Sequence, residues 1–473
     1  MGRGIGRIGQ SNFDGNGTES AIRCVNQLRG AAIDSLILLT SLSKNLIHQS
    51  NNSQEGIVER LIASQQELTA VERFSQRYQS ITEPASESLY RDLIPLTAPE
   101  PGEQYSFEID LDVCSGCKAC VAACHNLNGL EEGEIWRNVG LMTGGDDFNP
   151  VVQHVTSACH HCLEPGCMSG CPVRAYEKDP VTGIVEHLDD QCIGCKYCMF
   201  TCPYDVPSYS KSKGIVRKCN MCVDRLRVGE APACVQSCPN DAIKIRKVKV
   251  DDLVALEAGS SLLPGCPDSS LTRPSTSYVT SGDVSEKGLP IDFYSAKSQH
   301  AHFPLVFMLV LTQVALGIFG MGCLMTLVGE AVGNFFTWHA IGGFVTLSAG
   351  LALAGLHLGR PLKAYRAMSG YRTSWLSREI IGFNAFAGAA SSFVSSCFLF
   401  PQWSWLLSMV TVVAGAIAVE CSVMLYVVTG RPLWSSQRTH SLFFLSALVS
   451  GAAATIVLLG SQNAGLQSLR QWF

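Results

Sequence analysis

The stretch CSGCKACVAAC, residues 114–124, opens a series of four cysteine motifs that ends at residue 239. The second motif reads CHHCLEPGCMSGCP (159–172), the third CIGCKYCMFTCP (192–203) and the fourth CNMCVDRLRVGEAPACVQSCP (219–239). Thiols grouped so densely predict a metal-binding domain around which the rest of the chain is organised. Each motif supplies four cysteines: Cys114, Cys117, Cys120 and Cys124; Cys159, Cys162, Cys167 and Cys171; Cys192, Cys195, Cys198 and Cys202; and Cys219, Cys222, Cys234 and Cys238.

The first and third motifs have the spacing C-x2-C-x2-C-x3-C of bacterial ferredoxins. There, three closely spaced thiolates bind one iron–sulfur cubane and the fourth binds the neighbouring cubane, so such motifs act in pairs. The second and fourth motifs keep the C-x2-C start and the C-x3-C-P end, and only their middle loop is longer. The sequence therefore predicts four [4Fe–4S] clusters with all sixteen cysteines as ligands.

Zinc sites and disulfides are the alternatives to iron–sulfur clusters. A single C-x2-C pair often binds zinc, but four repeats that end in C-x3-C do not suit separated zinc pairs. Disulfides suit small secreted chains, whereas this chain has 473 residues and no recognisable signal peptide. Twenty-one cysteines indicate assembly in a reducing compartment. The net charge of -5 gives no indication of a nucleic-acid partner.

Four segments follow from the composition. Residues 1–104 are predicted to be a partly disordered, partly helical extension, with helices near 33–42 and 56–78. Residues 105–250 form the four-cluster ferredoxin-type domain, with strands expected in YSFEIDLDVC (105–114), GIVEHLDDQC (183–192) and DAIKIRKVKV (241–250). Residues 251–302 are rich in Ser, Thr, Pro and Gly, which predicts a linker on an extended surface path. Residues 303–473 form a membrane anchor.

The anchor is predicted from long runs without charges. Residues 303–328, 335–358, 380–400 and 442–459 carry none, and residues 403–428 carry only Glu420. A span needs about 20 apolar residues, so the sequence predicts five transmembrane helices. The fold class is therefore an α+β tandem ferredoxin-like iron–sulfur domain fused to an all-α transmembrane helix bundle.

The basic loops predict the orientation of the chain. The loop between the second and third spans and that between the fourth and fifth are basic, whereas the other two loops have no Lys or Arg. Positively charged loops stay in the cytoplasm. With five spans, both basic loops lie on the side of the iron–sulfur domain. We therefore expect a multi-pass protein of the cytoplasmic (inner) membrane whose iron–sulfur domain faces the cytoplasm.

Two parts of the chain resemble subunits of the dimethyl sulfoxide reductase family. Residues 105–250 resemble its iron–sulfur subunit through the four motifs, CPYDVP (202–207) and RKCNMCVDRLRVGEAPACVQSCPNDAI (217–243). The chain from residue 302 onward resembles its membrane anchor subunit through HLGRPLKAYRA (357–367) and SWLSREI (374–380). The resemblance identifies the chain as a fusion of the two, although the family's anchor usually has eight spans and five are predicted here.

The resemblance implies an electron-transfer subunit that takes electrons from a membrane quinol, menaquinol or ubiquinol. The four clusters would pass them to a separate molybdopterin-containing catalytic subunit, as in anaerobic respiration, with the first motif paired to the fourth and the second to the third. This chain has no molybdenum active site of its own. The alternative is a membrane redox module of a hydrogenase or formate dehydrogenase that delivers electrons into quinone. A membrane metal-binding protein without redox activity fits the cysteine spacing poorly.

Three residues near span ends are candidates for the quinone site. His357 ends the second span and Glu379 opens the third on the same side, where an imidazole and a carboxylate could bind quinol hydroxyls and accept protons. Both match positions in the family's anchor motif that are linked to quinol binding. Arg360 is a third candidate. The alternatives are that His357 caps a helix, that Glu379 pairs with Arg378 or Arg360, and that Arg360 only follows the positive-inside rule.

Overall fold

The structure is a computed structural model that describes residues 72, 73, 75, 76, 90, 92–145, 150–281, 288–295, 302–328 and 334–460. The elements below belong to one compact unit, residues 77–473. The disordered start and the helix predicted at 33–42 lie outside the described residues, as does almost all of the helix predicted at 56–78.

The central sheet joins the two ends of the cysteine-rich region. Strand β1 (Glu103–Asp110) precedes the first motif and pairs antiparallel with β8 (Ile243–Lys249), which follows the fourth, so that Glu103 lies opposite Lys249. Strand β9 (Ser277–Val279) adds to β1 in parallel. The pairing confirms the strands expected at both ends of the domain, and it brings the first and fourth motifs together.

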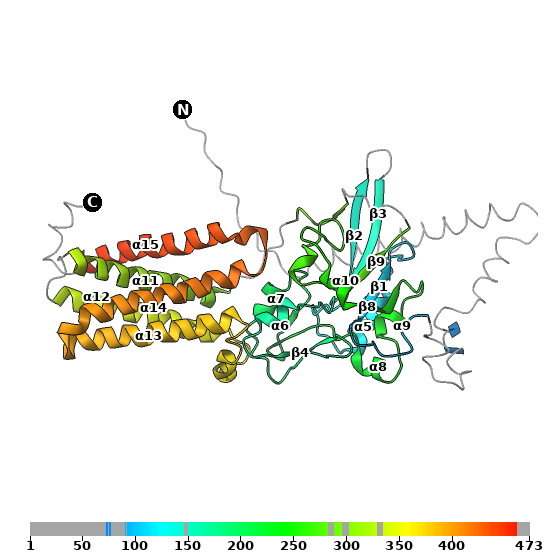
Figure 1. The fold of residues 1–473 in the computed structure, drawn as a ribbon, viewed down its shortest axis with the longest axis horizontal. Helices are drawn as coiled ribbons and strands as arrows, with labels where there is room; N and C mark the ends of the chain where they lie inside the picture. Colours follow the sequence, from blue (N-terminus) through cyan, green and yellow to red (C-terminus); the bar gives the residue numbers. More distant parts are fainter. Residues whose placement is uncertain are drawn as a thin grey trace, which may run out of the picture. The chain divides into compact units, whose positions relative to one another are not determined.

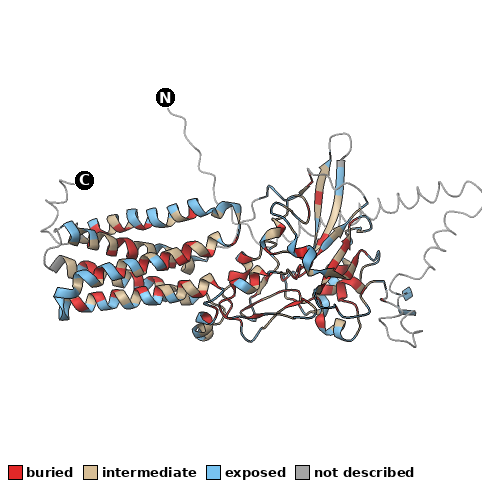
Figure 2. Cartoon of the chain, in the orientation of Figure 1, coloured by how far each residue is buried: buried red, intermediate tan, exposed pale blue. Residues whose placement is uncertain are grey.

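Short hairpins and helices present the cysteines. Hairpin β4–β5 (Tyr176–Lys178 and Val185–His187) separates the second motif from the third, and hairpin β6–β7 (Ser208–Ser210 and Ile215–Arg217) separates the third from the fourth. The short helices of the domain are α5 (Ala119–Leu127), α6 (Gly166–Gly170), α7 (Tyr197–Thr201), α8 (Val223–Arg227) and α9 (Ala233–Gln236). All but α8 carry at least one cysteine of the motifs. Figure 2 shows buried residues concentrated where these elements meet.

The segment 251–302 differs from the extended linker that its composition predicted. Besides β9, it contributes β10 (Leu289–Pro290), which pairs antiparallel with β2 (Asn138–Gly145) of the long hairpin β2–β3, where β3 is Pro150–Ser157. It also holds η1 (Ser269–Leu271), and α10 (Val250–Val254) leads into it. Backbone pairing with distant strands orders this polar segment, and no local apolar period reveals such pairing.

Among the residues that the structure describes, five helices are long and apolar enough to cross a membrane, which confirms the predicted number. They are α11 (Phe303–Val328), α12 (Asn334–Ala354), α13 (Trp375–Leu399), α14 (Ser404–Val427) and α15 (Ser436–Gly460), and they run side by side in Figure 1. The 3-10 turns η2 (Gly355–His357), η3 (Pro361–Met368), η4 (Pro401–Trp403) and η5 (Pro432–Trp434) lie between them. Helices α13 and α15 begin several residues before the uncharged runs that were used to predict them. The runs start later only because the first turns of these two helices contain charged residues.

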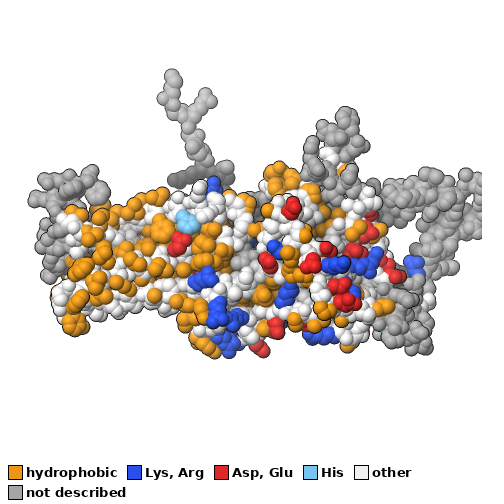
Figure 3. Space-filling model, in the orientation of Figure 1, with side chains coloured by type: hydrophobic (Ala, Val, Ile, Leu, Met, Phe, Trp, Pro, Cys, Tyr) orange, Lys and Arg blue, Asp and Glu red, His pale blue; other side chains and the backbone are white. Residues whose placement is uncertain are grey.

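Figure 3 shows hydrophobic side chains covering the visible face of the helix bundle and Lys and Arg side chains gathered near one end of it. The basic residues between α12 and α13 lie in and around η3, which confirms that this loop is a single basic segment. Its side chains reach the iron–sulfur domain: Lys363 Nζ donates to the carbonyl of Asp190 at 3.0 Å. The bundle and the iron–sulfur domain therefore meet at this loop.

Helices α11 and α15 cross at two glycines. A Cβ atom at Gly317 would lie 1.9 Å from the carbonyl oxygen of Ala447 and 2.7 Å from Cα of Gly451. Such a close approach of two backbones is possible only with small residues at the crossing.

We expect Gly317→Leu to destabilise the bundle by about 1–3 kcal/mol or more, because backbone atoms cannot move aside for the new side chain. The measurement is thermal unfolding in detergent. Gly320→Leu is the control, since a Cβ atom there would meet nothing within 4 Å. Equal melting temperatures for the two variants would show that the crossing is not closely packed.

Candidate functional site

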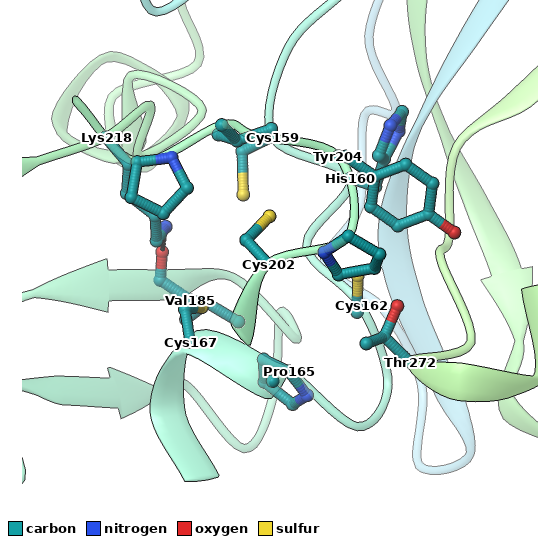
Figure 4. Close-up of a pocket in the computed structure, with 14 residues that line it drawn as sticks. Cys159, His160, Cys162, Pro165, Cys167, Val185, Cys202, Tyr204, Lys218 and Thr272 are labelled. Atoms are coloured by element: carbon teal, nitrogen blue, oxygen red, sulfur yellow. Dashed lines mark hydrogen bonds between the residues drawn. The ribbon is translucent and has the colours of Figure 1, made fainter. Parts of the chain in front are cut away.

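Cysteines from two motifs line each of three cavities. The first, about 370 Å³, is lined by Cys159, Cys162 and Cys167 of the second motif and by Cys202 of the third. In Figure 4 the sulfur atoms of Cys159 and Cys202 point toward each other across it. The second, about 300 Å³, is lined by Cys114, Cys117 and Cys120 with Cys238. The third, about 270 Å³, is lined by Cys171 with Cys192, Cys195 and Cys198.

The remaining cysteines form a fourth quartet. Cys124 at the end of the first motif lies within electrostatic range of Cys219, Cys222 and Cys234 of the fourth. In every quartet, three thiols come from one motif and the fourth from its partner, as the ferredoxin spacing requires. The motif pairs are first with fourth and second with third, which is the pairing that the resemblance implied.

The quartets suit a cluster better than a single ion. The thiols of three quartets line cavities of about 270 to 370 Å³. A cubane with iron at alternate corners needs four thiolates spread around it in this way, whereas zinc draws its ligands to about 2.3 Å.

The local backbone is arranged around the sulfur atoms. Lys118 and Lys196, which precede the third cysteine of their motifs, have φ of 62° and 63°, and these left-handed residues turn the chain into α5 and α7. The amide of Ala175 donates to Cys171 Sγ at 3.2 Å, and that of Ala242 donates to Cys238 Sγ at 3.3 Å. Amide donors at sulfur stabilise thiolates and are one of the terms that tune cluster potentials.

Burial raises the pKa of Cys162 to about 12 and that of Cys219 to about 11. Without a metal these thiols are therefore protonated at neutral pH. Iron binding must displace their protons, so filling of the quartets is coupled to pH and to folding of the domain.

The quartet that includes Cys195 and Cys198 is adjacent to the membrane anchor. The amide of Arg360 donates to the carbonyl of Ile193 at 3.0 Å, and Ser374 Oγ donates to the carbonyl of Gly170 at 2.6 Å. Tyr197, between the two cysteines, donates from its hydroxyl to the carbonyl of Leu425 in α14 at 2.9 Å. The iron–sulfur domain is therefore hydrogen-bonded directly to the helix bundle beside this quartet.

Of the quinone candidates, Glu379 is placed next to this junction. Its side chain is buried at 4% exposure, and it accepts a hydrogen bond from Ser422 Oγ of α14. Burial raises the pKa of Tyr197, and the charge of Glu379 contributes to the rise, so the two side chains are close. The alternative ion pair with Arg378 is not formed: Arg378 donates instead to the carbonyls of Tyr371 and Arg372.

His357 and Arg360 are placed differently. His357 lies within electrostatic range of Lys196, the neighbour of Tyr197, and its imidazole interacts with the backbone of Ala354 at the end of α12, as expected if it caps that helix. Arg360 Nη1 donates to the carbonyl of Asp189 at 2.8 Å. His357 therefore lies near Lys196 and Glu379 near Tyr197, which are adjacent residues of the third motif. The guanidinium of Arg360 is instead hydrogen-bonded to the iron–sulfur domain.

Two other ionisable groups in the spans have partners within the bundle. Glu420 Oε1 and His440 Nε2 are 3.0 Å apart, between α14 and α15. His339 is buried, with Nε2 at 3.0 Å from Thr455 Oγ1.

Sequence reasoning missed Tyr197 and Ser422. Tyr197 occupies a variable position within C-x2-C, and its contact is with a residue 228 positions away. Ser422 is an ordinary small residue of a membrane helix until the buried carboxylate opposite it is known. The one feature of the sequence that could have indicated a role for Tyr197 was the presence of an aromatic hydroxyl between two cysteines of a cluster motif.

Comparisons with known proteins agree with this geometry. The family described as "4Fe-4S dicluster domain" matches residues 151–248, and that described as "DMSO reductase anchor subunit (DmsC)" matches residues 297–472. The B subunit of the anaerobic dimethyl sulfoxide reductase of Haemophilus influenzae is 33% identical over 181 residues, which are 36% of this chain and 87% of that protein. The B subunit of the same enzyme in Escherichia coli K12 is 34% identical over 179 residues, 36% of this chain and 86% of that protein. The formate dehydrogenase-O iron-sulfur subunit of Escherichia coli K12 is 36% identical over 158 residues, 30% of this chain and 52% of that protein.

Proposed function

Because this chain belongs to the dimethyl sulfoxide reductase family, as an iron–sulfur subunit fused to a membrane anchor, we propose that it passes electrons from membrane quinol to a separate molybdopterin-containing subunit. Electron transfer and membrane anchoring follow from the two parts of the chain and their relatives. The observation that carries the proposal is the set of hydrogen bonds that join the anchor to the second and third motifs, beside a buried carboxylate.

We assign one [4Fe–4S] cluster to each cysteine quartet. When bound, these clusters supply one-electron redox chemistry. We propose the following order of electron transfer. The quartet of Cys195, which adjoins the anchor, comes first, and the quartet of Cys202, built from the same two motifs, comes second. The quartets of Cys219 and Cys114 follow, and Cys117 of the last is exposed. We propose that the catalytic subunit binds at this exposed end.

At the membrane end, quinol oxidation must release two protons and two electrons. We propose that Glu379 accepts a quinol proton and that Ser422 orients its carboxylate. We propose that the imidazole of His357, within electrostatic range of Lys196 of the third motif, binds the second hydroxyl and accepts its proton. Arg360 holds the loop on the iron–sulfur domain through Asp189. The bilayer supplies the quinol, either menaquinol or ubiquinol.

The second candidate is a redox module of a formate dehydrogenase or hydrogenase that delivers electrons into quinone. The formate dehydrogenase relative supports it, but that match covers only 52% of the relative. The anchor match at residues 297–472 favours the reductase.

We further propose that the iron–sulfur domain faces the cytoplasm. The basic loop around η3 contacts that domain, and positively charged loops remain on the cytoplasmic side. A cysteine introduced at Leu362, which is 93% exposed, is expected to resist a membrane-impermeant thiol reagent in intact cells and to react after lysis. Labelling in intact cells would place the domain on the other side.

Metal analysis of the complex, purified anaerobically through a tag on this chain, tests the proposed function. We expect about 16 iron atoms per chain, together with molybdenum and a co-purifying large subunit. Nickel without molybdenum would favour the hydrogenase alternative. Zinc in place of iron would refute electron transfer.

A further inference from the structure

Lys218 and Arg137 are the buried Lys and Arg side chains in the described part of the chain, with 3% and 2% exposure. They occupy successive gaps between cysteine quartets. We propose that both are positioning residues for electron transfer, each holding a positive charge between two clusters and raising the reduction potential of both. The inference rests on the proposed function, because it requires the quartets to hold clusters.

Lys218 lies between the quartets of Cys202 and Cys219. It lines the first cavity, on the side of Cys159 in Figure 4, and it directly precedes Cys219. Its ammonium donates to the carbonyl of Cys219 at 2.9 Å and to that of Val185. Two carbonyl acceptors hold the charge in place, and no carboxylate among the described residues forms an ion pair with it.

Arg137 lies one gap further from the membrane anchor. Its electrostatic neighbours are Cys219, Cys234 and Cys124 of one quartet and Cys120 of the next. Nη1 donates to Thr156 Oγ1 at 3.1 Å, and that hydroxyl is 3.7 Å from Cys120 Sγ. The guanidinium also stacks over Phe107, with Cζ 4.7 Å from the ring centroid.

The second amino group of Arg137 supports this assignment. Nη2 is buried and meets no nitrogen or oxygen acceptor in the described structure, and the side chain that the guanidinium reaches is the thiol of Cys234. A buried donor without an acceptor is costly, and arginine cannot lose its proton to avoid the cost. Because the surrounding groups are thiols of two quartets, the sulfur atoms of a bound cluster are the acceptors that would satisfy this donor.

The direction of the effect follows from charge. Reduction adds an electron to a cluster, so a nearby cation stabilises the reduced form and raises the potential. Water is excluded at both sites, which strengthens the interaction over that at a surface. Lys178 near Cys162 differs because it is only partly buried and has Glu164 as an opposing charge.

The test is a potentiometric titration of the clusters in the purified complex, followed by electron paramagnetic resonance. Lys218→Met and Arg137→Gln remove the charge while keeping most of the side-chain volume, and Lys218→Arg and Arg137→Lys keep the charge. At fixed ambient potential, we expect each neutral variant to lower the reduced-to-oxidised ratio of its two flanking clusters about tenfold, which is about 59 mV for a one-electron couple. Lys249→Met, at an exposed position on β8, is the control.

The pattern of shifts decides the outcome. The quartet of Cys219 should shift in both neutral variants, and the quartet next to the anchor in neither. Unchanged potentials in neutral variants with full iron content would refute the inference and leave the proposed function intact. Equal shifts of all four potentials would also refute it, because they indicate a general loosening of the domain.

If a neutral variant loses iron, the charge-retaining variant must restore both the iron content and the cluster potentials, and failure to do so refutes the inference. A wild-type complex without iron would refute the proposed function itself.

Discussion

Replacement of Glu379 by Gln is expected to lower quinol-driven reduction of the clusters about 10²- to 10⁴-fold, the usual contribution of a positioned proton acceptor. The carboxylate is buried, is oriented by Ser422 Oγ and lies next to Tyr197 of the third motif. A glutamine keeps the size and the hydrogen bond but cannot accept the proton. The measurement is the rate of cluster bleaching after anaerobic addition of a reduced quinone, with iron content as the check on assembly.

Glu420→Gln is the control for this variant, because it removes a carboxylate from the neighbouring membrane helix. The Glu420 side chain is 43% exposed and is paired with His440, on a part of the bundle that the Glu379 hydrogen bond does not involve. We expect its rate to stay close to that of the wild type. If Glu420→Gln slowed quinol oxidation and Glu379→Gln did not, the quinol site would have to be moved to the α14–α15 face.

The second large effect is expected at the junction between the anchor and the iron–sulfur domain. A Cβ atom at Gly359 would lie 2.1 Å from the carbonyl oxygen of Gly214 and 2.8 Å from the hydroxyl of Tyr209. Gly359→Val should therefore separate the two parts at a cost of about 1–3 kcal/mol or more. The equilibrium constant for contact between the two parts would fall about fivefold or more. Electron tunnelling weakens steeply with distance, so quinol-driven reduction should fall accordingly.

The predicted signature is loss of reduction by quinol with retention of reduction by dithionite, since the cysteine quartets themselves are unchanged. Gly355→Val provides the comparison: a Cβ atom there would meet nothing within 4 Å, although Gly355 is only four residues away. Similar rates for both variants would mean that the close approach of Gly359 to Gly214 does not hold the parts together.

Much of the iron–sulfur domain was predictable because its ligands are spaced along the chain by the geometry of the cubane. Three thiols on one short loop can reach only one cluster, so the spacing of the first and third motifs indicates that Cys124 and Cys202 bind neighbouring clusters, and the pairing of the motifs was implied by the resemblance. Membrane spans were equally accessible, since a run of about 20 apolar residues without a charge is rare outside membrane helices. Strands β1 and β8 were visible from their alternation.

The remaining features depend on contacts that are distant in sequence. Strands β9 and β10 are short and polar, and only their pairing with β1 and β2 orders them. The sequence placed His357, Arg360 and Glu379 on one side of the membrane, but it did not separate their roles. In the structure their partners differ: Arg360 donates to the carbonyl of Asp189, and Glu379 accepts from Ser422. The buried charges of Lys218 and Arg137 likewise became apparent only once the quartets were placed.

The measurement that most directly tests the central claim is reduction of the complex by quinol in proteoliposomes, followed by the visible absorbance of the iron–sulfur clusters. The account predicts that a reduced quinone bleaches this absorbance without any other donor, and that an oxidised substrate of the catalytic subunit restores it. Clusters that dithionite reduces fully but quinol does not reduce at all would contradict a path from the membrane through Glu379 and the third motif.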